Sequence, residues 1–303
     1  MLKDTLLYLA HNNKVRKFVI TNRATRAVSR RFVAGETLDE AIQVTRTLND
    51  RGMSVSLDHL GENVSDAKEA IAATQDYINI LSCIKQTGVN ANISIKLTAL
   101  GLDISQELCE QNIRRILEHA QQYPIFVRID MEGSAYTAKT VDITLRMHKE
   151  FEHVGTVIQS CMYSSKYDIA QLVAQGIRVR LVKGAYKEPK TVAYQDKKVV
   201  DHNYVELMKV LLLRGNYPAL ATHDENIINA ACKFARDHGI SQAAYEFQML
   251  YGIRRDLQER LVKQGYNMRI YVPYGSQWYP YLMRRMAERP ANLVFVVSNA
   301  LRR

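Results

Sequence analysis

The sequence predicts an α/β protein, one closed (β/α)8 barrel of the TIM type with extra N-terminal helices. From residue 54 onward, eight short apolar or β-branched runs alternate with segments of helical periodicity. Successive runs begin about 31 residues apart, which is the size of a strand plus its crossover helix. A chain of 303 residues with 47% apolar content can bury the core of such a barrel.

The predicted strands follow one another at regular spacing. In chain order they are SVSLDHLG, NISIKLTALG, IFVRIDMEG, TVIQSCMYS, RVRLVKGAY, ALATHDE, AAYEFQML and MRIYVPYG, and they begin near residues 54, 92, 125, 156, 178, 219, 243 and 268. Apolar residues recur at helical spacing in several intervening segments, among them 105–122, 138–153, 203–215 and 225–238. Strand then helix, eight times, is typical of a parallel barrel.

We expect two parts, a helical segment over 1–50 that packs on the barrel and a catalytic barrel over 51–303. The clearest helix of the first part lies within 34–52. A long charged run, 187–204, follows the fifth strand. Insertions after a barrel strand usually lie on the active-site side, so we expect this run there.

The net charge of +10 raises the question of an anionic partner. Part of the excess lies near the start of the chain, in Arg16, Lys17, Arg23, Arg26, Arg30 and Arg31. A solvated helical face explains these residues more simply than a patch for nucleic acid, and we expect no nucleic-acid partner. Early charges and the absence of a long apolar stretch indicate a cytoplasmic protein, with peripheral contact at the inner face of the membrane as the alternative.

The sequence lacks the residue patterns of several common kinds of site. The four cysteines show no C-x-x-C spacing, which favours free core thiols. His59 and His223 are isolated, so we expect no metal site. No Rossmann or P-loop glycine motif is present, and no Ser or Cys stands in a nucleophile-elbow context.

Polar residues follow nearly every predicted strand. In a barrel the C-terminal strand ends face the active site, so their convergence predicts one. They are Asp58, Glu62, Lys96, Arg128, Asp130, Glu132, Gln159, Arg180, Lys183, Tyr186, Thr222, His223, Asp224, Glu246, Gln248, Tyr271 and Tyr274.

Two short motifs point to anionic ligands. Lys183, Gly184 and Ala185 bring one cation and two small residues together, a weak signal for a phosphate or cofactor cradle. Arg284 and Arg285 are predicted one turn into the last helix, where the pair and the helix N-terminus could hold a carboxylate. A surface Arg-Arg-Glu helix is the alternative interpretation.

Five segments in order resemble the FAD-dependent proline dehydrogenases of the monofunctional bacterial type. They are SIKLTALG, RLVKGAY, ATHD, YEFQMLYG and YVPYG with YLMRRMAERPAN, and the similarity covers about residues 54–299. The resemblance implies a distorted (β/α)8 barrel with FAD at its C-terminal face. It also implies oxidation of L-proline to 1-pyrroline-5-carboxylate, with electrons passed from the flavin to a membrane quinone.

The resemblance also implies residue roles. Asp130 and Arg180 are expected to be catalytic. Substrate contacts are expected from Glu62, Lys96, Leu250, Tyr271, Tyr281, Arg284 and Arg285, with Tyr186 in the same wall. Cofactor contacts are expected from Met131, Gln159, Arg180, Lys183, Gly184, Ala185, Thr222 and His223. Glu62 and Arg284 are expected to pair as a gate.

At 303 residues the chain has no room for the additional enzyme domain of the bifunctional family members, so a separate 1-pyrroline-5-carboxylate dehydrogenase is the expected downstream partner. Two other interpretations stay open. One is a flavin barrel that acts on another cyclic amine such as hydroxyproline. Tyr271 speaks against this substrate, because it would crowd the hydroxyl group on the ring. The other is an anion-binding module with an inert barrel, whose basic helices contact lipid or nucleic acid.

Overall fold

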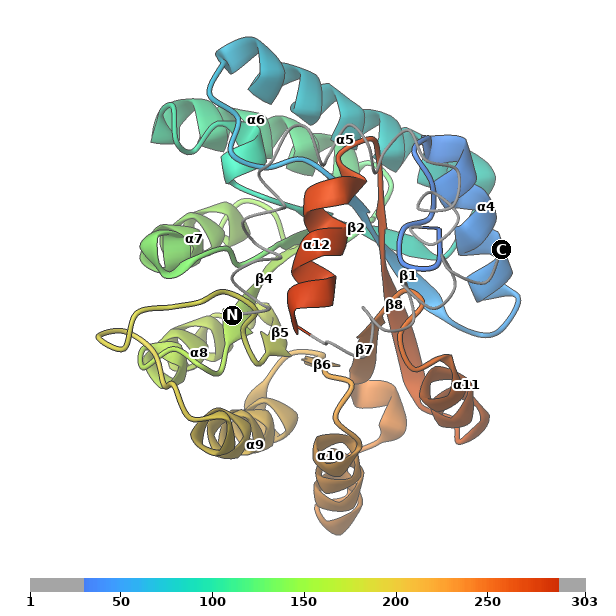
Figure 1. Cartoon of the computed structure of the whole chain (residues 1–303), viewed down its shortest axis with the longest axis vertical. Helices are drawn as coiled ribbons and strands as arrows, with labels where there is room; N and C mark the ends of the chain where they lie inside the picture. The colour runs from blue at the N-terminus through green and yellow to red at the C-terminus, as the bar shows by residue number, and fades with distance from the viewer. Residues whose placement is uncertain (1–29, 289–303) are drawn as a thin grey trace.

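The computed structural model describes residues 30–288, and for 284–288 it describes the backbone alone. The eight parallel strands close into a barrel in sequence order, each paired with its chain neighbours and β8 paired with β1 (Figure 1). The strands are β1 Ser54–His59, β2 Ala91–Ile95, β3 Val127–Ile129, β4 Val154–Gln159, β5 Arg178–Val182, β6 Ala219–Ala221, β7 Glu246–Leu250 and β8 Asn267–Tyr274. The predicted (β/α)8 barrel is confirmed.

Helices surround the strands (Figure 1). They are α4 Leu38–Asn49, α5 Ala67–Thr87, α6 Gln106–Gln121, α7 Ser134–His148, α8 Ser165–Ala174, α9 Lys197–Arg214, α10 Glu225–Asp237, α11 Arg255–Lys263 and α12 Trp278–Glu288, with 3-10 turns at Thr98–Leu100 and Gln242–Ala244. The helix expected within 34–52 is α4, which packs on β1 and β8. Residues 1–29 lie outside the described part, so the division at residue 50 stays a prediction.

In two places the helix begins earlier than the segment of helical spacing. The helix expected over 138–153 begins at Ser134, directly after its N-cap Gly133. The helix expected over 203–215 begins at Lys197, because the Asp196 carboxylate accepts a hydrogen bond from the Lys198 backbone N–H. The second half of the charged run 187–204 is therefore helical.

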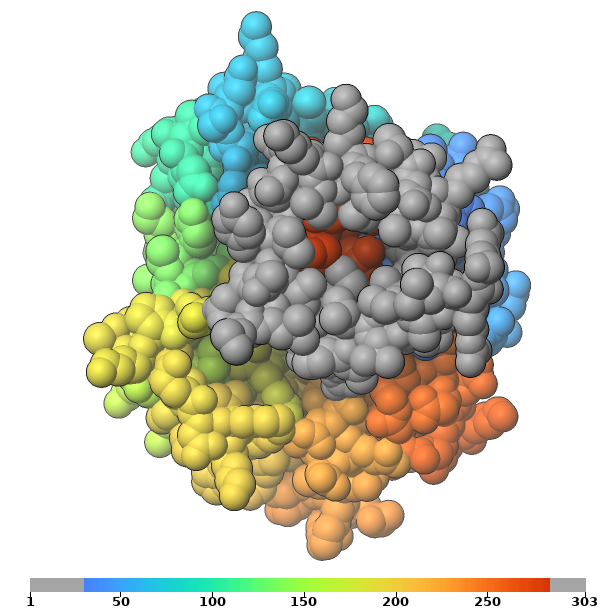
Figure 2. Space-filling view, in the orientation of Figure 1, coloured from blue at the N-terminus to red at the C-terminus, as the bar shows by residue number. Residues whose placement is uncertain are grey.

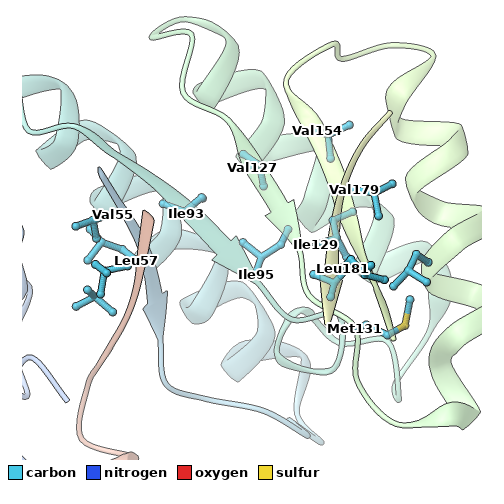
Figure 3. Packing of buried hydrophobic residues seen from close by; sticks show 14 of the residues in the cluster. Val55, Leu57, Ile93, Ile95, Val127, Ile129, Met131, Val154, Val179 and Leu181 are labelled. Atoms are coloured by element: carbon cyan, nitrogen blue, oxygen red, sulfur yellow. The ribbon is translucent and has the colours of Figure 1, made fainter. Parts of the chain in front are cut away.

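The apolar side chains of the strands lie toward the helices, outside the barrel. Figure 3 shows buried residues of this kind, such as Val55 with Leu57, and Ile93 with Ile95. In the sequence they alternate with polar residues along most of the strands. These side chains belong to one continuous core with those of the covering helices. The alternate residues of the strands, most of them polar, therefore face the barrel interior.

Polar side chains in the interior contact one another across the barrel. Arg180 on β5 donates to the Ser56 hydroxyl on β1 at 3.2 Å and to the Ser94 hydroxyl on β2 at 3.1 Å. Since these strands are not neighbours of β5, the contacts run through the interior. Branched apolar residues usually fill a barrel of this kind, so a charged interior here requires its own hydrogen bonds and counter-ions.

Helix α12 lies across one end of the barrel (Figure 1), and part of it is visible at the centre of that face in Figure 2. Because α12 follows β8, this is the face at which the strands end. Arg284 and Arg285 are the seventh and eighth residues of α12, nearly two turns from its start. The prediction that they stand one turn in, beside the helix N-terminus, was wrong, since the dipole effect is confined to the first turn.

A glycine in β4 makes room for the interior charges. A Cβ at Gly155 would collide with the Arg178 carbonyl and would lie 2.8 Å from Cζ of Phe126.

We expect Gly155→Ala to lower the free energy of unfolding by about 2 kcal/mol through overpacking, measured by urea denaturation. Gly61→Ala is the matched control, because nothing lies within 4 Å of its added Cβ, and should stay within about 0.5 kcal/mol of wild type. Equal denaturation midpoints for the two variants would contradict this packing.

Candidate active site

A cavity of about 1250 Å³ opens at the C-terminal ends of the strands, bordered by the start of α12. It brings together every residue to which the family resemblance gave a site role and whose side chain the structure describes. Its lining includes Glu62, Lys96, Asp130, Met131, Gln159, Arg180, Lys183, Gly184, Ala185, Tyr186, Thr222, His223, Leu250, Tyr271 and Tyr281. The side chains of Arg284 and Arg285 lie outside the described part, so the Glu62–Arg284 gate stays a prediction.

Asp130 is the centre of a buried network at the floor of this cavity. Its Oδ1 accepts a hydrogen bond from Nη1 of Arg180 at 2.8 Å, and its Oδ2 accepts one from the Tyr271 hydroxyl, also at 2.8 Å. The Arg180 guanidinium also lies 5.3 Å from the centre of the Tyr271 ring. Residues of β5 and β8 thus fix both oxygens of a carboxylate that stands directly after β3.

A second buried ion pair lies beside the first. The ammonium of Lys96, the residue directly after β2, donates a hydrogen bond to the Asp58 carboxylate on β1. Burial alone would lower the pKa of Lys96, but Asp58 and its neighbours outweigh burial and raise that pKa above its usual value. Burial raises the pKa of the Asp58 carboxyl and Lys96 lowers it, and with the further rise caused by Asp130 the pKa stays above its usual value. Lys96 therefore stays charged at neutral pH.

Glu132 positions the loop next to Lys96. Its carboxylate accepts hydrogen bonds from the Thr98 hydroxyl at 2.6 Å and the Thr98 backbone N–H at 3.1 Å. Burial raises the pKa of Glu132, while the two Thr98 bonds act in the opposite direction. Its backbone carbonyl accepts from Nε2 of Gln159 at 3.0 Å, which fixes the orientation of that amide.

Gly184 forms a close-packed turn after β5. Its φ of +109° lies in the region that favours glycine, and a Cβ there would collide with Sγ of Cys161 and stand 3.2 Å from Oε1 of Gln159. Burial raises the pKa of the Cys161 thiol to about 11. The thiol is therefore uncharged at neutral pH and packs against Gly184. The predicted small-residue cradle therefore has a steric reason in the structure.

Lys183 is held by two carboxylates. Its ammonium lies 2.8 Å from Oδ2 of Asp224 and 2.5 Å from Oδ1 of Asp201. Burial alone would raise the pKa values of both acids, but the Lys183 cation lowers them below the usual value. Asp201 was not predicted as a site residue, because the sequence placed it in a loop, whereas it lies in the first turns of α9.

His223 is oriented by the backbone. The Leu250 N–H donates to Nε2 of His223 at 3.0 Å, so this nitrogen is the acceptor of the imidazole. The bond joins the loop after β6 to the end of β7. Thr222 and Leu250, two other predicted contacts, are held at the cavity by the same pair of strands.

Two residues predicted at the C-terminal strand ends do not lie there. Glu246 is the first residue of β7, and Arg128 lies in the middle of β3, so both belong to the opposite end of the barrel. The error came from treating every polar residue of a run as a C-terminal tip. Tyr274 is at the correct end but stacks on His59, with ring centres 5.1 Å apart.

The cavity residues fit a large phosphate-bearing cofactor. The volume of the cavity exceeds the roughly 300–1000 Å³ that is usual for small-molecule sites. The backbone at Gly184, which carries no side chain, borders this space together with two cations that are paired with acids, Lys183 and Arg180. Among the described residues, no group of His, Cys, Asp and Glu side chains is arranged to hold a metal ion.

Comparison with known proteins decides the family. A family model described as proline dehydrogenase matches residues 41–298. The chain belongs to the proline dehydrogenase family. Proline dehydrogenase 1 of Bacillus subtilis (strain 168) is 42% identical over 303 residues, covering all of both chains. The proline dehydrogenase of Deinococcus radiodurans is 43% identical over 284 residues, 91% of this chain and 90% of that one.

Solved structures agree with the fold. Proline utilization A (PutA) from Bdellovibrio bacteriovorus, inactivated by N-propargylglycine, superposes with a TM-score of 0.82 at 27% identity. The match covers 90% of this chain and 34% of that one, so this chain spans about a third of the larger protein. In residues 30–288, no helix is both long and apolar enough to cross a bilayer.

The Lys96–Asp58 pair generates a pH-dependent prediction. Lys96→Met leaves Asp58 buried beside Asp130 without a counter-ion, so the folded-state pKa of Asp58 rises further. A raised folded-state pKa costs stability as the pH climbs above the usual carboxyl value of about 4. We expect a loss of about 3 kcal/mol in unfolding free energy at pH 8 and a smaller loss at pH 5, measured by urea denaturation.

The double variant Asp58→Asn with Lys96→Met is the control, because it removes both charges together. It should lose less stability at pH 8 than Lys96→Met alone, and its loss should not vary between the two pH values. A double variant as unstable as the single one at pH 8 would contradict the charge-pair explanation.

Proposed function

We propose that this protein oxidises L-proline to 1-pyrroline-5-carboxylate with FAD as the hydride acceptor. The observation that carries the proposal is the buried Asp130–Arg180–Tyr271 network beside the Lys183-Gly184-Ala185 turn, in one cavity of a chain of this family. When bound, FAD supplies the acceptor for the hydride that leaves the carbon next to the substrate nitrogen.

The charges of the cavity floor support an amino-acid substrate. Lys96 balances Asp58, and Arg180 balances Asp130, so these four groups sum to zero. A substrate carboxylate therefore needs cations from elsewhere. We infer that Arg284 and Arg285 supply them, since α12 borders the cavity at Tyr281.

The remaining residues would hold the ring and the cofactor. Tyr186, Leu250, Tyr271 and Tyr281 would form the wall around the substrate ring, which fixes the reacting carbon. Lys183, Gly184 and Ala185 would hold the cofactor together with Met131, Gln159, Thr222 and His223. Arg180 would place a fixed positive charge beside a flavin ring that becomes negative on reduction.

The cellular setting is part of the same proposal. We infer that the reduced flavin passes its electrons to a membrane quinone and that a separate dehydrogenase consumes the product. A peripheral contact of the cytoplasmic protein with the inner face of the membrane would bring it to the quinone. The basic residues near the start of the chain support such a contact, at about 1 kcal/mol for each well-placed cation.

The first experiment is an absorbance spectrum of the purified protein before and after anaerobic addition of L-proline. We expect an oxidised-flavin band at about 450 nm that bleaches on addition. Trans-4-hydroxyproline in the same experiment should bleach the band at least about tenfold more slowly, because Tyr271 would crowd the ring hydroxyl. Absence of bound or bindable flavin would overturn the proposal, and equal rates for both substrates would favour the broader cyclic-amine activity.

Asp130→Asn tests the network at the cavity floor. The amide keeps the size of the carboxylate but leaves the buried Arg180 without its counter-ion, so we expect kcat/KM for proline to fall by about 10²–10³. Flavin content, read from the spectrum, should change little. Asp142→Asn, a variant of an exposed acid paired with Arg146, is the matched control and should match wild type. Unchanged kcat/KM in Asp130→Asn would remove this residue from the mechanism.

A further inference from the structure

A second cavity, of about 390 Å³, lies at the opposite end of the barrel from the candidate active site. Its lining comes from the beginnings of β2, β3, β5, β7 and β8 and from the segments that precede them. The proposed reaction does not use this end. In barrels of this kind the N-terminal end usually serves stability, so a charged cavity there needs its own explanation.

The cavity is strongly positive. Its charged lining residues are Lys85, Arg128, Arg178, Arg269 and Glu246. Glu246 is occupied by Arg269, whose Nε lies 3.0 Å from Oε1 and 3.1 Å from Oε2 of that carboxylate. Within residues 30–288, the other three cations form no ion pair with a carboxylate, although Glu246 lies close enough to act on the pKa of Arg128. An excess of three positive charges remains around one small volume.

Two of the lining side chains are deeply buried and hold polar atoms without a partner. Arg128 is 2% exposed and its Nε makes no hydrogen bond, although its Nη1 donates to the carbonyls of Thr156 at 3.0 Å and Arg178 at 2.6 Å. Asn92 is 7% exposed and its Oδ1 also lacks a partner. The unpaired Nε–H of Arg128 is costly at this depth and an oxyanion would accept its hydrogen bond, whereas Oδ1 of Asn92 requires a donor.

Aromatic rings hold the guanidinium groups in place. The Arg178 guanidinium lies 5.3 Å from the ring centres of both Phe126 and Tyr217, and that of Arg128 lies 4.7 Å from the centre of Phe126. Gly155 leaves room for this arrangement, since its absent Cβ would stand 3.1 Å from Nη1 of Arg128. Fixed guanidinium planes lose little conformational entropy when they bind an oxyanion.

We propose that this cavity binds a phosphate group, free or carried by a small metabolite, through Arg128, Arg178 and Lys85, with the side-chain N–H group of Asn92 as a further donor. A dianion matches the charge excess, and the guanidinium fork matches the oxygens of a phosphate. Burial and the nearby Arg180 lower the pKa of Arg128 well below its usual value. An anion in the cavity would offset that cost of keeping Arg128 charged.

The test is calorimetric titration of the purified full-length protein with inorganic phosphate at constant ionic strength. We expect saturable binding to one site, together with a phosphate-dependent rise in Tm. Arg178→Gln should weaken phosphate binding at least about tenfold, because it removes one charge-assisted contact. Arg115→Gln, a variant of an exposed arginine on α6, is the matched control and should bind as wild type does.

Two further variants keep the test decisive. Lys85 is exposed, so Lys85→Gln will fold even if Arg178→Gln does not, and it should weaken binding about threefold. Lys183→Gln removes the cation of the other cavity and should leave this phosphate site intact. Loss of binding in Lys183→Gln, equal binding by Arg178→Gln, Lys85→Gln and Arg115→Gln, or no saturable binding at all would overturn the proposal.

The source of the phosphate group is separated by titrating glycerol 3-phosphate in parallel. Tighter binding of this ester than of inorganic phosphate, lost in the Arg178→Gln variant, would assign the cavity to a phosphorylated metabolite. Tighter binding of inorganic phosphate would assign it to the free ion. Both results support a phosphate site, and both are independent of whether the opposite cavity oxidises proline.

Discussion

The ion pair between Asp130 and Arg180 is the interaction on which the arrangement of the barrel depends. Arg180 extends from β5 to the hydroxyls of Ser56 and Ser94 on the other side of the interior, while Tyr271 on β8 donates to the same carboxylate. Each of these side chains stands where branched apolar residues would usually fill a barrel. Since a buried charge without a partner costs several kcal/mol, the strands must keep the register that brings these groups together.

The same constraint explains why the two ends of the barrel differ. At the C-terminal end the charges are matched in pairs, Lys96 with Asp58 and Arg180 with Asp130, which leaves the floor neutral and open to a ligand that brings its own charge. At the N-terminal end Glu246 is matched by Arg269, while Arg128 and Arg178 stay in excess. Gly155 belongs to this balance, because a Cβ there would collide with the Arg178 carbonyl and crowd the Arg128 guanidinium.

The sequence predicted the eight strands and the members of the main cavity because both depend on short-range signals. Alternating β-branched runs mark strands, and residues directly after them meet at one end, which is why Lys96, Asp130 and Lys183 were found together. It could not predict Asp201, which meets Lys183 only because a cap at Asp196 extends α9 toward the cavity. It also misplaced Glu246 and Arg128, because position within a strand, rather than residue type, decides which end a side chain joins.

Charge balance also limits how the main cavity can work. Any group that enters it with a negative charge disturbs a floor whose four ions already cancel, so binding of a carboxylate there requires new positive charge at the rim. Helix α12 is placed to provide it, since it lies across the strand ends and follows directly from β8, the strand that carries Tyr271 (Figure 1). A cation on a helix at the rim can approach the ligand without entering the buried network, which leaves the Asp130–Arg180 pair unchanged when the ligand binds.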